Sequence, residues 1–406
     1  MSIWTEEGKV DFPRMRQDRV EKAREQMKKD GIGAYLCFDP DNIKYLTDTY
    51  TELLVTTMFA RNVLFPRTGD PILYEWGFRW QRVRDELSPW LKGNVKPGWR
   101  LGFFMRSGLY PEAFINDLKK VLSEHDILDE PLAIDMPIVS LDFGEMLRKA
   151  GLNVVDGFES LFRARMVKTQ DEIECWKISI SIAEEIFDAI RQAIRPGVRE
   201  IDLGGIAADL CWKRGCDGPV ASLVCSGENT NPNMMVGHDR RIRPGEMIFV
   251  DLPGVRWKGY NTCVYRCFTC GRATQRQKEL YAETLDLIRK GMKQIKPGNT
   301  TADICKAWPG PEHWGGKNWR DVSDVAIGHG LGLGQQENPV ITPLFSFEHP
   351  VKLEENMCLA LETFYGSGPG EKPKQGCRIE EMILVTNDGC EILSKWPVEE
   401  ITEAWI

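Results

Sequence analysis

The sequence predicts an α/β N-terminal domain followed by an α+β C-terminal domain made of two related halves. Three observations lead to this prediction. The chain has 406 residues, which is long for a single hydrophobic core and sufficient for two domains. Helical and strand patterns alternate over the N-terminal part of the chain, up to residue 163. Beyond that point, the same series of sequence patterns occurs twice in the same order.

The composition is that of an ordinary soluble globular protein, with 42% hydrophobic and 28% charged residues. A formal net charge of -8 argues against nucleic acid or an anionic membrane as a partner. The N-terminal segment lacks the pattern of a secretion signal, and no apolar run approaches the roughly 18 residues that would span a bilayer. We therefore expect a cytoplasmic protein. Disulfides rarely persist in that compartment, so most of the 12 cysteines are expected to be small buried side chains.

In the first domain, periodic apolar residues over 14–30 predict an amphipathic helix that Gly31 ends. A short apolar run after it is halted at Pro40 and predicts a buried strand. The same criteria predict further strands at 61–66, 70–75 and 131–135 and a helix at 111–125. This alternation is typical of an α/β domain.

A long helix opens the second domain. Thr169 is placed to cap it, and Glu172, three residues later, completes a capping box. We place the domain boundary just before this helix. Residues 1–163 then form the N-terminal domain and residues 164–406 the C-terminal domain.

The second domain contains an internal repeat. The sequences IRPGVREIDL (194–203) and IKPGNTTADI (295–304) each follow a helical pattern and share an apolar–basic–Pro–Gly start. Each is followed by a histidine that lies thirteen positions before a carboxylate ending an apolar strand, Asp251 in the first half and Glu362 in the second. Two such pairings in one order indicate a duplicated half-domain, whose pseudo-twofold symmetry would bring the two carboxylates together.

Further polar residues accompany these two carboxylates. His329 lies between glycines, which let backbone approach a ligand closely. Glu380 and Glu381 head a strand in which alternate residues face inward, and His238 lies in a polar loop before the Asp251 strand. Each residue alone would more often be solvated or part of a turn. Together, strand-borne carboxylates and one imidazole suit Mn, Fe, Co or Zn.

The ordered motifs resemble the creatinase, aminopeptidase P and prolidase family. These motifs are VDLPG, GYNTCVYR, GHGLGL with QENP, LALET and RIEEMILVTNDG. The segments RMVKTQDEIECWKIS and FDPDNIKYLTD are similar to the same family, so the resemblance covers essentially the whole chain. It implies a "pita-bread" C-terminal domain, which is built from two related halves.

The resemblance also implies a set of metal ligands, because metal-dependent members use two aspartates, a histidine and two glutamates to hold a pair of metals. Four of these ligands fall on Asp251, His329, Glu362 and Glu380. The second aspartate falls on Cys263, and a second family histidine falls on Gln336. The site therefore lacks one bridging carboxylate, which argues against peptidase activity.

Cys263, Cys267 and Cys270 have the C-x3-C-x2-C spacing of radical-SAM cluster loops. The segment has the composition of a strand, however, in which Cys263 and Cys267 share a face and Cys270 points away, so the three side chains would not converge on one cluster. Two interpretations of Cys263 remain open. It is either a thiolate ligand beside His329 and the glutamates, or a neutral thiol in a site without metal. The expected cofactor is one divalent metal (zinc, iron or manganese) or none.

Creatinase, a family member that cleaves a C–N bond without metal, implies a second set of roles. Its acid–base histidine falls on His238, and two glutamates that hold the cationic substrate fall on Glu362 and Tyr265. These three are our catalytic candidates, and Gln336 and Arg378 are the expected substrate-binding residues. Histidine suits proton transfer because its pKa lies near working pH. Inward-facing carboxylates would favour a cationic small molecule.

Three functional hypotheses follow. The first is a creatinase-like enzyme that cleaves a C–N or C–S bond of a small, polar, cationic metabolite. The dimethylsulfoniopropionate lyases of the family make β-elimination a neighbouring reaction. The second is a metal-dependent Xaa-Pro peptidase that tolerates Cys263. The third is a non-catalytic binding protein, against which the retained acidic cluster argues. The family also implies a homodimer, and aromatic residues within 47–59 and 73–83 indicate surfaces that a partner covers.

Overall fold

The computed structural model describes residues 9–50, 61–102, 112–135, 141–218, 223–231, 237–322, 327–368 and 370–406. The chain divides into two compact units, residues 11–165 and residues 166–406, and Lys9 and Val10 belong with the second unit. Across the described ranges, no helix combines the length and the apolar character needed to cross a membrane.

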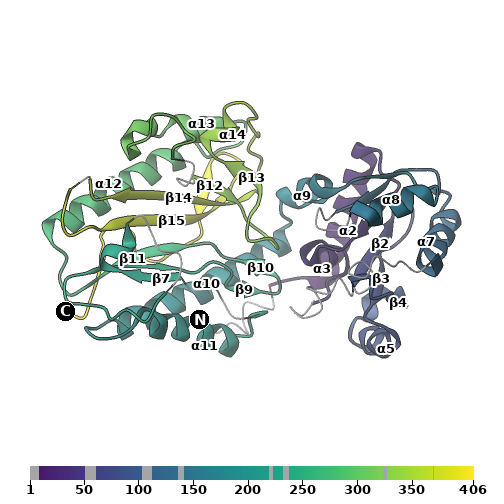
Figure 1. Ribbon diagram of the computed structural model, residues 1–406, viewed down its shortest axis with the longest axis horizontal. Helices are drawn as coiled ribbons and strands as arrows, with labels where there is room; N and C mark the ends of the chain where they lie inside the picture. Colours follow the sequence, from purple (N-terminus) through teal and green to yellow (C-terminus); the bar gives the residue numbers. More distant parts are fainter. Residues whose placement is uncertain are drawn as a thin grey trace. The chain divides into compact units, whose positions relative to one another are not determined.

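The N-terminal unit is built on one six-stranded sheet (Figure 1). In spatial order its strands are β4 (Val95–Pro97), β3 (Ile72–Glu75), β2 (Asn62–Pro66), β1 (Ala34–Cys37), β5 (Leu132–Ile134) and β6 (Val154–Asp156). The central strand β1 pairs antiparallel with β2 and parallel with β5, and all of its residues are buried. The helices of this unit are α2 (Phe12–Asp30), α3 (Pro40–Thr47), α5 (Phe78–Leu87), α7 (Glu112–Glu124), α8 (Leu141–Lys149) and α9 (Phe158–Met166).

Local sequence explains where these elements begin and end, and the expected α/β alternation is confirmed. Gly31 ends α2 with a φ of 66°, a left-handed conformation that glycine adopts at little cost. Pro40 begins α3 soon after β1. The Asp39 side chain caps that helix by accepting from the N–H groups of Asp41 and Asn42.

The C-terminal unit has two main sheets and a two-stranded ribbon. The first sheet, in spatial order, is β17 (Thr402–Ala404), β11 (Tyr265–Cys270), β8 (Met247–Asp251) and β7 (Leu223–Ser226). The second is β13 (Glu337–Ile341), β12 (Gly328–Gly330), β14 (Cys358–Gly366), β15 (Gly376–Val385) and β16 (Cys390–Ile392). The ribbon is β9 (Arg256–Trp257) and β10 (Tyr260–Asn261). The two sheets lie next to each other at β11 and β15, which brings strands of both halves into one core.

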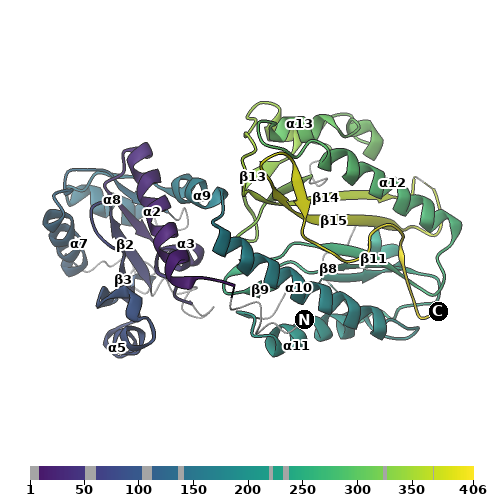
Figure 2. The ribbon, with the colours of Figure 1, turned by 180° about the vertical axis from the view of Figure 1, so that it is seen from behind.

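Helices cover the outer faces of these sheets (Figure 2). They are α10 (Gln170–Ala193), α11 (Glu200–Lys213), α12 (Gln275–Met292), α13 (Thr301–Lys306) and the short α14 (Pro343–Ser346). α11 packs against β7, and α12 packs against β14 and β15. As predicted, α10 begins at a capping box in which the side chains of Thr169 and Glu172 each bond the other's backbone N–H.

The two halves of the C-terminal unit repeat each other, as the sequence predicts. Each half runs from a long helix through a shorter one into strands, first α10 and α11 with β7 and β8, then α12 and α13 with β12 and β14. An isolated antiparallel bridge joins Arg199 to Arg241 in the first half, and an equivalent bridge joins Thr300 to Lys352 in the second. The shared sequence pattern therefore marks one folding motif used twice.

Two positional expectations for the strands are wrong. Glu362 does not end its strand, because β14 continues to Gly366. Glu380 and Glu381 lie in the middle of β15, not at its head. Both strands are longer than the apolar runs that predict them, because β14 and β15 pair with each other through the polar part as well, including the pair Glu362–Glu380.

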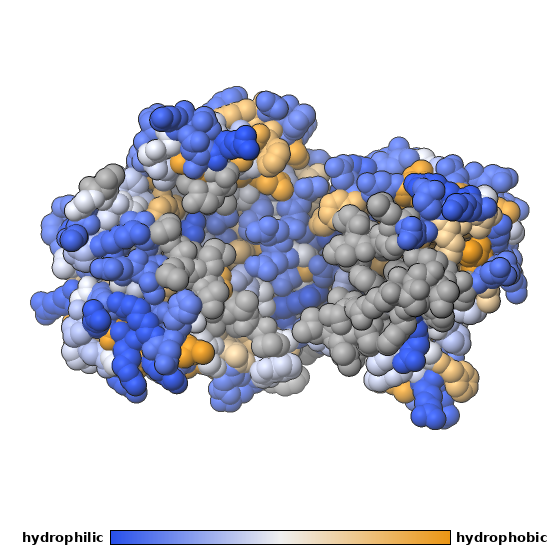
Figure 3. All heavy atoms as spheres, viewed as in Figure 1, coloured by the Kyte–Doolittle hydropathy of each residue, from blue (hydrophilic) through white to orange (hydrophobic). Residues whose placement is uncertain are grey.

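Exposed apolar side chains occur in both units. The predicted aromatic stretch 47–59 lies mostly outside the described residues, since 51–60 are not among them. In the N-terminal unit, Phe78 and Trp80 on α5 are exposed. In the C-terminal unit, Figure 3 shows apolar atoms gathered over α13, α14 and β13, where Val340 and Phe345 are exposed.

Candidate active site

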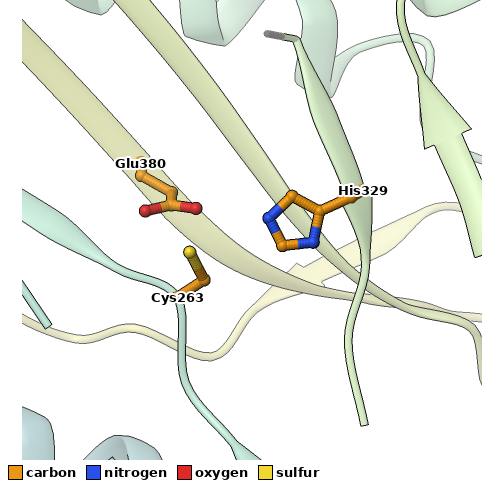
Figure 4. Close-up of side chains that lie close together, drawn as sticks. All are labelled: Cys263, His329 and Glu380. Carbon is orange, nitrogen blue, oxygen red and sulfur yellow. The ribbon is translucent and has the colours of Figure 1, made fainter. Parts of the chain in front are cut away.

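Three side chains from three segments meet in the C-terminal unit (Figure 4). Cys263 comes from the segment between β10 and β11, His329 from β12 and Glu380 from β15. All three are buried, and one donor atom of each lies within 4.8 Å of the other two. Figure 4 shows the thiol and the imidazole turned toward the carboxylate. These three residues are the donor cluster.

The glycines beside His329 are a packing requirement. β12 is hydrogen-bonded on both sides, to β13 and to β14. A Cβ at Gly328 would collide with the carbonyl oxygen of Ala360, and a Cβ at Gly330 with that of Asn338. His329 therefore carries the only side chain of β12, and the close pairing fixes where its ring lies.

A hydrogen bond selects the tautomer of His329. Nδ1 lies 2.8 Å from the carbonyl oxygen of Gly330, which is an acceptor only, so Nδ1 carries the proton. Nε2 is buried and has no hydrogen-bond partner among the described residues. The imidazole thus presents an unused lone pair to the cluster, the arrangement in which histidine binds a metal.

Glu380 is a buried acid without a well-directed hydrogen bond. It is 0% exposed, and neither carboxylate oxygen has a partner within the described part of the chain. Burial raises the pKa of Glu380 well above its usual range, and the charges of Glu362 and Asp251 raise it further. Burying a charge in this way costs several kcal/mol unless a cation is nearby.

The charged forms of Asp251 and Cys263 are also disfavoured by burial. Oδ1 of Asp251, the last residue of β8, has no partner among the described residues. Burial, followed by the charge of Glu362, raises the pKa of Asp251 well above its usual range. Burial and then the charge of Glu380 raise the pKa of the Cys263 thiol well above its usual range. Burial thus favours the protonated forms of these groups, and a bound metal ion would favour their ionised forms.

Tyr265 and Glu362 form a bonded pair beside the cluster. The Tyr265 hydroxyl donates to Oε2 of Glu362 at 2.9 Å. Burial, and then the Glu362 charge, raise the pKa of Tyr265 well above its usual range, so the phenol stays protonated and keeps donating. Tyr265 is paired with Asp251 in the first sheet, and Glu362 is paired with Glu380 in the second. The Tyr265–Glu362 hydrogen bond therefore joins the two halves of the unit.

Arg378 supplies positive charge at this place. Its guanidinium carbon lies 5.5 Å from the ring centroid of Tyr265 and 5.3 Å from that of Phe364. Burial by itself would lower the pKa of Arg378, but Tyr265, Glu362 and the other acids outweigh it and the pKa rises. Its Nε has no hydrogen-bond partner within the described residues. Arg378 is thus held by aromatic rings and charge.

Two predicted site residues are exposed. His238 lies on a loop, where its backbone N–H donates to Oε2 of Glu200 at 3.0 Å. Residues 232–236 of the same loop lie outside the described residues. Gln336 is on an exposed turn. The structure thus brings seven predicted residues together: Asp251, Cys263, Tyr265, His329, Glu362, Arg378 and Glu380.

Sequence patterns did not reveal two buried ion pairs of the C-terminal unit. Arg266 meets Glu381 at 2.9 Å, and the Ser394 hydroxyl also bonds this carboxylate, so adjacent glutamates on β15 face different groups. Lys168 meets Glu337, the neighbour of Gln336, at 3.0 Å. One signal in the sequence could have indicated such a pair. Arg266 stands among apolar residues in the strand segment YRCFTC, where a buried charge needs a partner.

The three cysteines at 263, 267 and 270 occupy different surroundings, and Cys263 precedes β11 instead of sharing that strand with Cys267. Among the described residues, Cys263 is the only cysteine of the donor cluster. Cys267 instead lies against the backbone of Arg378, with its sulfur 3.3 Å from the Arg378 nitrogen. Cys270 is buried at the end of β11.

The donor cluster fits a single divalent metal. A thiolate, an imidazole Nε2 and a carboxylate are the ligands that zinc and iron take in proteins, and sulfur makes manganese a poorer match. The unused Nε2 and the unpartnered oxygens of Glu380 are the observations that favour a cation here. Three protein ligands would leave a coordination position for water or substrate.

The fold and the cluster together define a class of protein, with an α/β N-terminal unit and a duplicated C-terminal unit that carries acidic and imidazole donors on its central strands. Comparison with known sequences then gives the family. The chain belongs to metallopeptidase family M24, whose pattern matches residues 174–387. The creatinase/prolidase N-terminal domain matches residues 19–167.

Relatives that match nearly the whole chain carry different activities in their names. The dimethylsulfoniopropionate lyase DddP of Roseobacter denitrificans is 25% identical over 96% of this chain and 87% of its own length. The creatinase of a Bacillus species is 24% identical over 93% and 90%. Among solved structures, the Xaa-Pro dipeptidase from Bacillus anthracis matches with a TM-score of 0.74 at 20% identity, covering 96% and 99%. The last likeness shows that the fold is pita-bread. Together the relatives support an M24-family enzyme.

Proposed function

We propose that this protein cleaves a C–N or C–S bond of a small, polar, cationic metabolite and does not act as a peptidase. The observation that carries this proposal is the surplus of buried acid: Asp251 and Glu380 have carboxylate oxygens without partners, and Arg378 is the nearby cation. By the family resemblance, Cys263 stands where a second metal-bridging aspartate would be. The remaining negative charge is then available to one metal and to a cationic substrate.

The residues divide into two groups in this proposal. Cys263, His329 and Glu380 would hold one zinc or iron ion, which when bound supplies a Lewis acid. Glu362 faces the cationic group of the substrate, and the hydroxyl of Tyr265 keeps one oxygen of this carboxylate fixed. Orienting the carboxylate in advance lowers the ordering cost when the substrate binds.

Proton transfer is assigned to His238, on the resemblance to creatinase. Its side chain is exposed and can exchange a proton with solvent after each turnover. The backbone N–H of His238 donates to Glu200, and this hydrogen bond holds the loop next to the exposed imidazole. The pair of Tyr265 and Glu362 is the alternative route for the proton, because it is already hydrogen-bonded.

Arg378 and Gln336 are proposed to bind the rest of the substrate. The guanidinium of Arg378 suits a carboxylate, which many small cationic metabolites also carry. Two of the relatives support a small substrate, since one is named a dimethylsulfoniopropionate lyase and the other a creatinase.

The test is a substrate screen on protein purified without added metal, with its metal content measured by mass spectrometry. The panel contains creatine, ectoine, dimethylsulfoniopropionate and Xaa-Pro dipeptides. We expect about one zinc or iron per chain, turnover of a cationic compound and no turnover of the peptides. A peptide as the best substrate would establish the peptidase alternative instead. Binding without turnover of any compound would indicate a non-catalytic protein.

A further inference from the structure

A second cavity lies in the C-terminal unit, separate from the donor cluster. Its volume is about 510 Å³, within the roughly 300–1,000 Å³ of small-molecule sites. It lies against α12 and the last part of β14. Tyr365 lines it, whereas Glu362 belongs to the donor site, and side chains three positions apart on a strand point to opposite faces. The walls that matter for its chemistry are Glu283, Asp286, Lys290, Trp308, His313 and Tyr365.

Three of these walls are aromatic rings. The centroids of His313 and Tyr365 are 5.0 Å apart at an interplanar angle of 37°, and Trp308 lies beside them in the lining. Trp314, outside the lining, packs against two of them, with its ring centroid 4.9 Å from that of His313 and 6.2 Å from that of Trp308. Burial lowers the pKa of His313, so this ring is neutral at neutral pH and adds no positive charge.

The charged groups come from one face of α12. Glu283, Asp286 and Lys290 are spaced three and four residues apart, which places them on the same side of the helix. The Lys290 ammonium is neutralised by Asp286 at 2.6 Å. Among the described residues, the Glu283 carboxylate has one weak ion pair, with Arg276 at 3.9 Å. Burial, and then the charge of Glu283, raise the pKa of the Tyr365 phenol. The lining therefore carries one net negative charge, on Glu283.

From this geometry we propose that the cavity binds a small organic cation of the alkylammonium class. Aromatic faces attract a cation through their electron-rich centres, and a soft, weakly hydrated ammonium loses little by leaving water. Glu283 adds a charge of the opposite sign at the rim. A metal ion would find few oxygen ligands among these rings, and an anion would meet a negative wall.

The experiment is calorimetric titration of the full-length protein with choline at constant ionic strength. The control ligand is 3,3-dimethylbutan-1-ol, which has the shape of choline without the charge. We expect saturable binding of choline and binding of the alcohol that is weaker by about 3- to 30-fold, the range of one cation–aromatic interaction. Glu283→Gln and Tyr365→Leu should each weaken choline by a similar factor.

Two further variants separate this cavity from the donor site and from general charge effects. Glu279→Gln removes the same charge from α12 outside the lining, and we expect it to leave choline affinity unchanged. Glu362→Gln removes a charge from the donor site, and the choline binding that depends on Glu283 should persist in this variant. Equal binding of the alcohol, no binding of choline, or an affinity lost in Glu362→Gln but kept in Glu283→Gln would each overturn the proposal.

Discussion

Cys263 is the position at which the donor site departs from the ligand pattern of the family. In the family pattern its position belongs to a metal-bridging aspartate, whose two oxygens can reach two metals at once. A thiol offers a single donor atom and, when buried beside Glu380, keeps its proton unless a cation displaces it. We propose that this one side chain changes the family's pattern for two metals into a site for one.

The first prediction concerns this residue. We expect Cys263→Ala to lose its zinc or iron, because two ligands hold a metal much less tightly than three. Cys263→Asp should restore the family pattern and raise manganese or cobalt binding. Metal content after dialysis, measured by mass spectrometry, checks both. Cys390→Ser, which changes a cysteine of β16, is the matched control and should keep the wild-type metal. Retention of metal by Cys263→Ala would show that the thiol is not a ligand.

The second prediction separates the two proton-transfer routes. His238→Ala should lower kcat on the best substrate by on the order of 100- to 10,000-fold, the range for a lost acid–base group. Folding should be unaffected, because the side chain is exposed. Tyr265→Phe frees Glu362 and should mainly raise KM. A His238→Ala enzyme within about threefold of wild type, together with a Tyr265→Phe enzyme reduced in kcat, would move the role to the Tyr265–Glu362 pair.

At the scale of elements, the ends of β1 and β5 hold a buried acid that the sequence did not mark. Asp135 follows β5, and its carboxylate accepts from the backbone N–H of Phe38 at 2.8 Å and from the Asn42 amide at 2.9 Å. These bonds connect β5 to the start of α3, so the carboxylate fixes how the first helix after β1 leaves the sheet. Burial, and then the charge of Asp39, raise the pKa of Asp135 to about 7.

The third prediction is the pH dependence that follows. The pKa of about 7 in the folded state exceeds the unfolded value of about 3.9, so the folded state binds this proton more tightly. The stabilisation is fully present below about pH 4 and is lost as pH rises through about 7. The contribution of Asp135 to the free energy of unfolding should fall by up to about 1.4 kcal/mol per pH unit between about pH 4 and pH 7.

Urea unfolding between about pH 5 and pH 7 measures this slope, and Asp39→Asn isolates it. The substitution removes the charge that adds to the raised pKa, while asparagine still caps α3 well. The variant should therefore show a flatter dependence on pH than the wild type. Equal slopes for the two proteins would show that the charge of Asp39 does not contribute to the raised pKa of Asp135.

At the scale of the whole molecule, α5 is a helix without a buried residue of its own. Phe78 is 71% exposed and Leu87 is 64% exposed, and Trp80 stacks on Trp76 with ring centroids 6.1 Å apart. Large apolar side chains gathered on one short helix are typical of a surface that another protein covers. On the family resemblance, we expect the partner to be a second copy of the chain.

The fourth prediction is accordingly a homodimer in sedimentation experiments. The double variant Phe78→Lys with Leu87→Lys should shift the protein to monomer, because two charges would replace the apolar contacts. Phe345→Lys, at an exposed apolar residue of the C-terminal unit, is the control and should remain dimeric. A double variant that stays dimeric would place the interface elsewhere, and a monomeric wild type with full activity would exclude the dimer.

The sequence by itself determined the features that depend on local order along the chain. Apolar periodicity, the Gly31 helix end and the Thr169 capping box are set by neighbouring residues, and the internal repeat is visible as a repeated pattern. The family motifs also named seven residues that the structure brings close together, whereas His238 and Gln336 are exposed. These inferences succeed because each needs only residues a few positions apart or an ordered set of motifs.

The tertiary structure alone decided how those residues are used. The pairing of β14 with β15 placed Glu362 and Glu380 in mid-strand, and it set Glu380 toward the donor cluster and Glu381 toward Arg266. The Gly330 carbonyl selected the free nitrogen of His329. No sequence motif indicates the aromatic cavity beside α12. Each of these depends on contacts between segments distant in sequence, and local patterns carry no information about which distant atoms will meet.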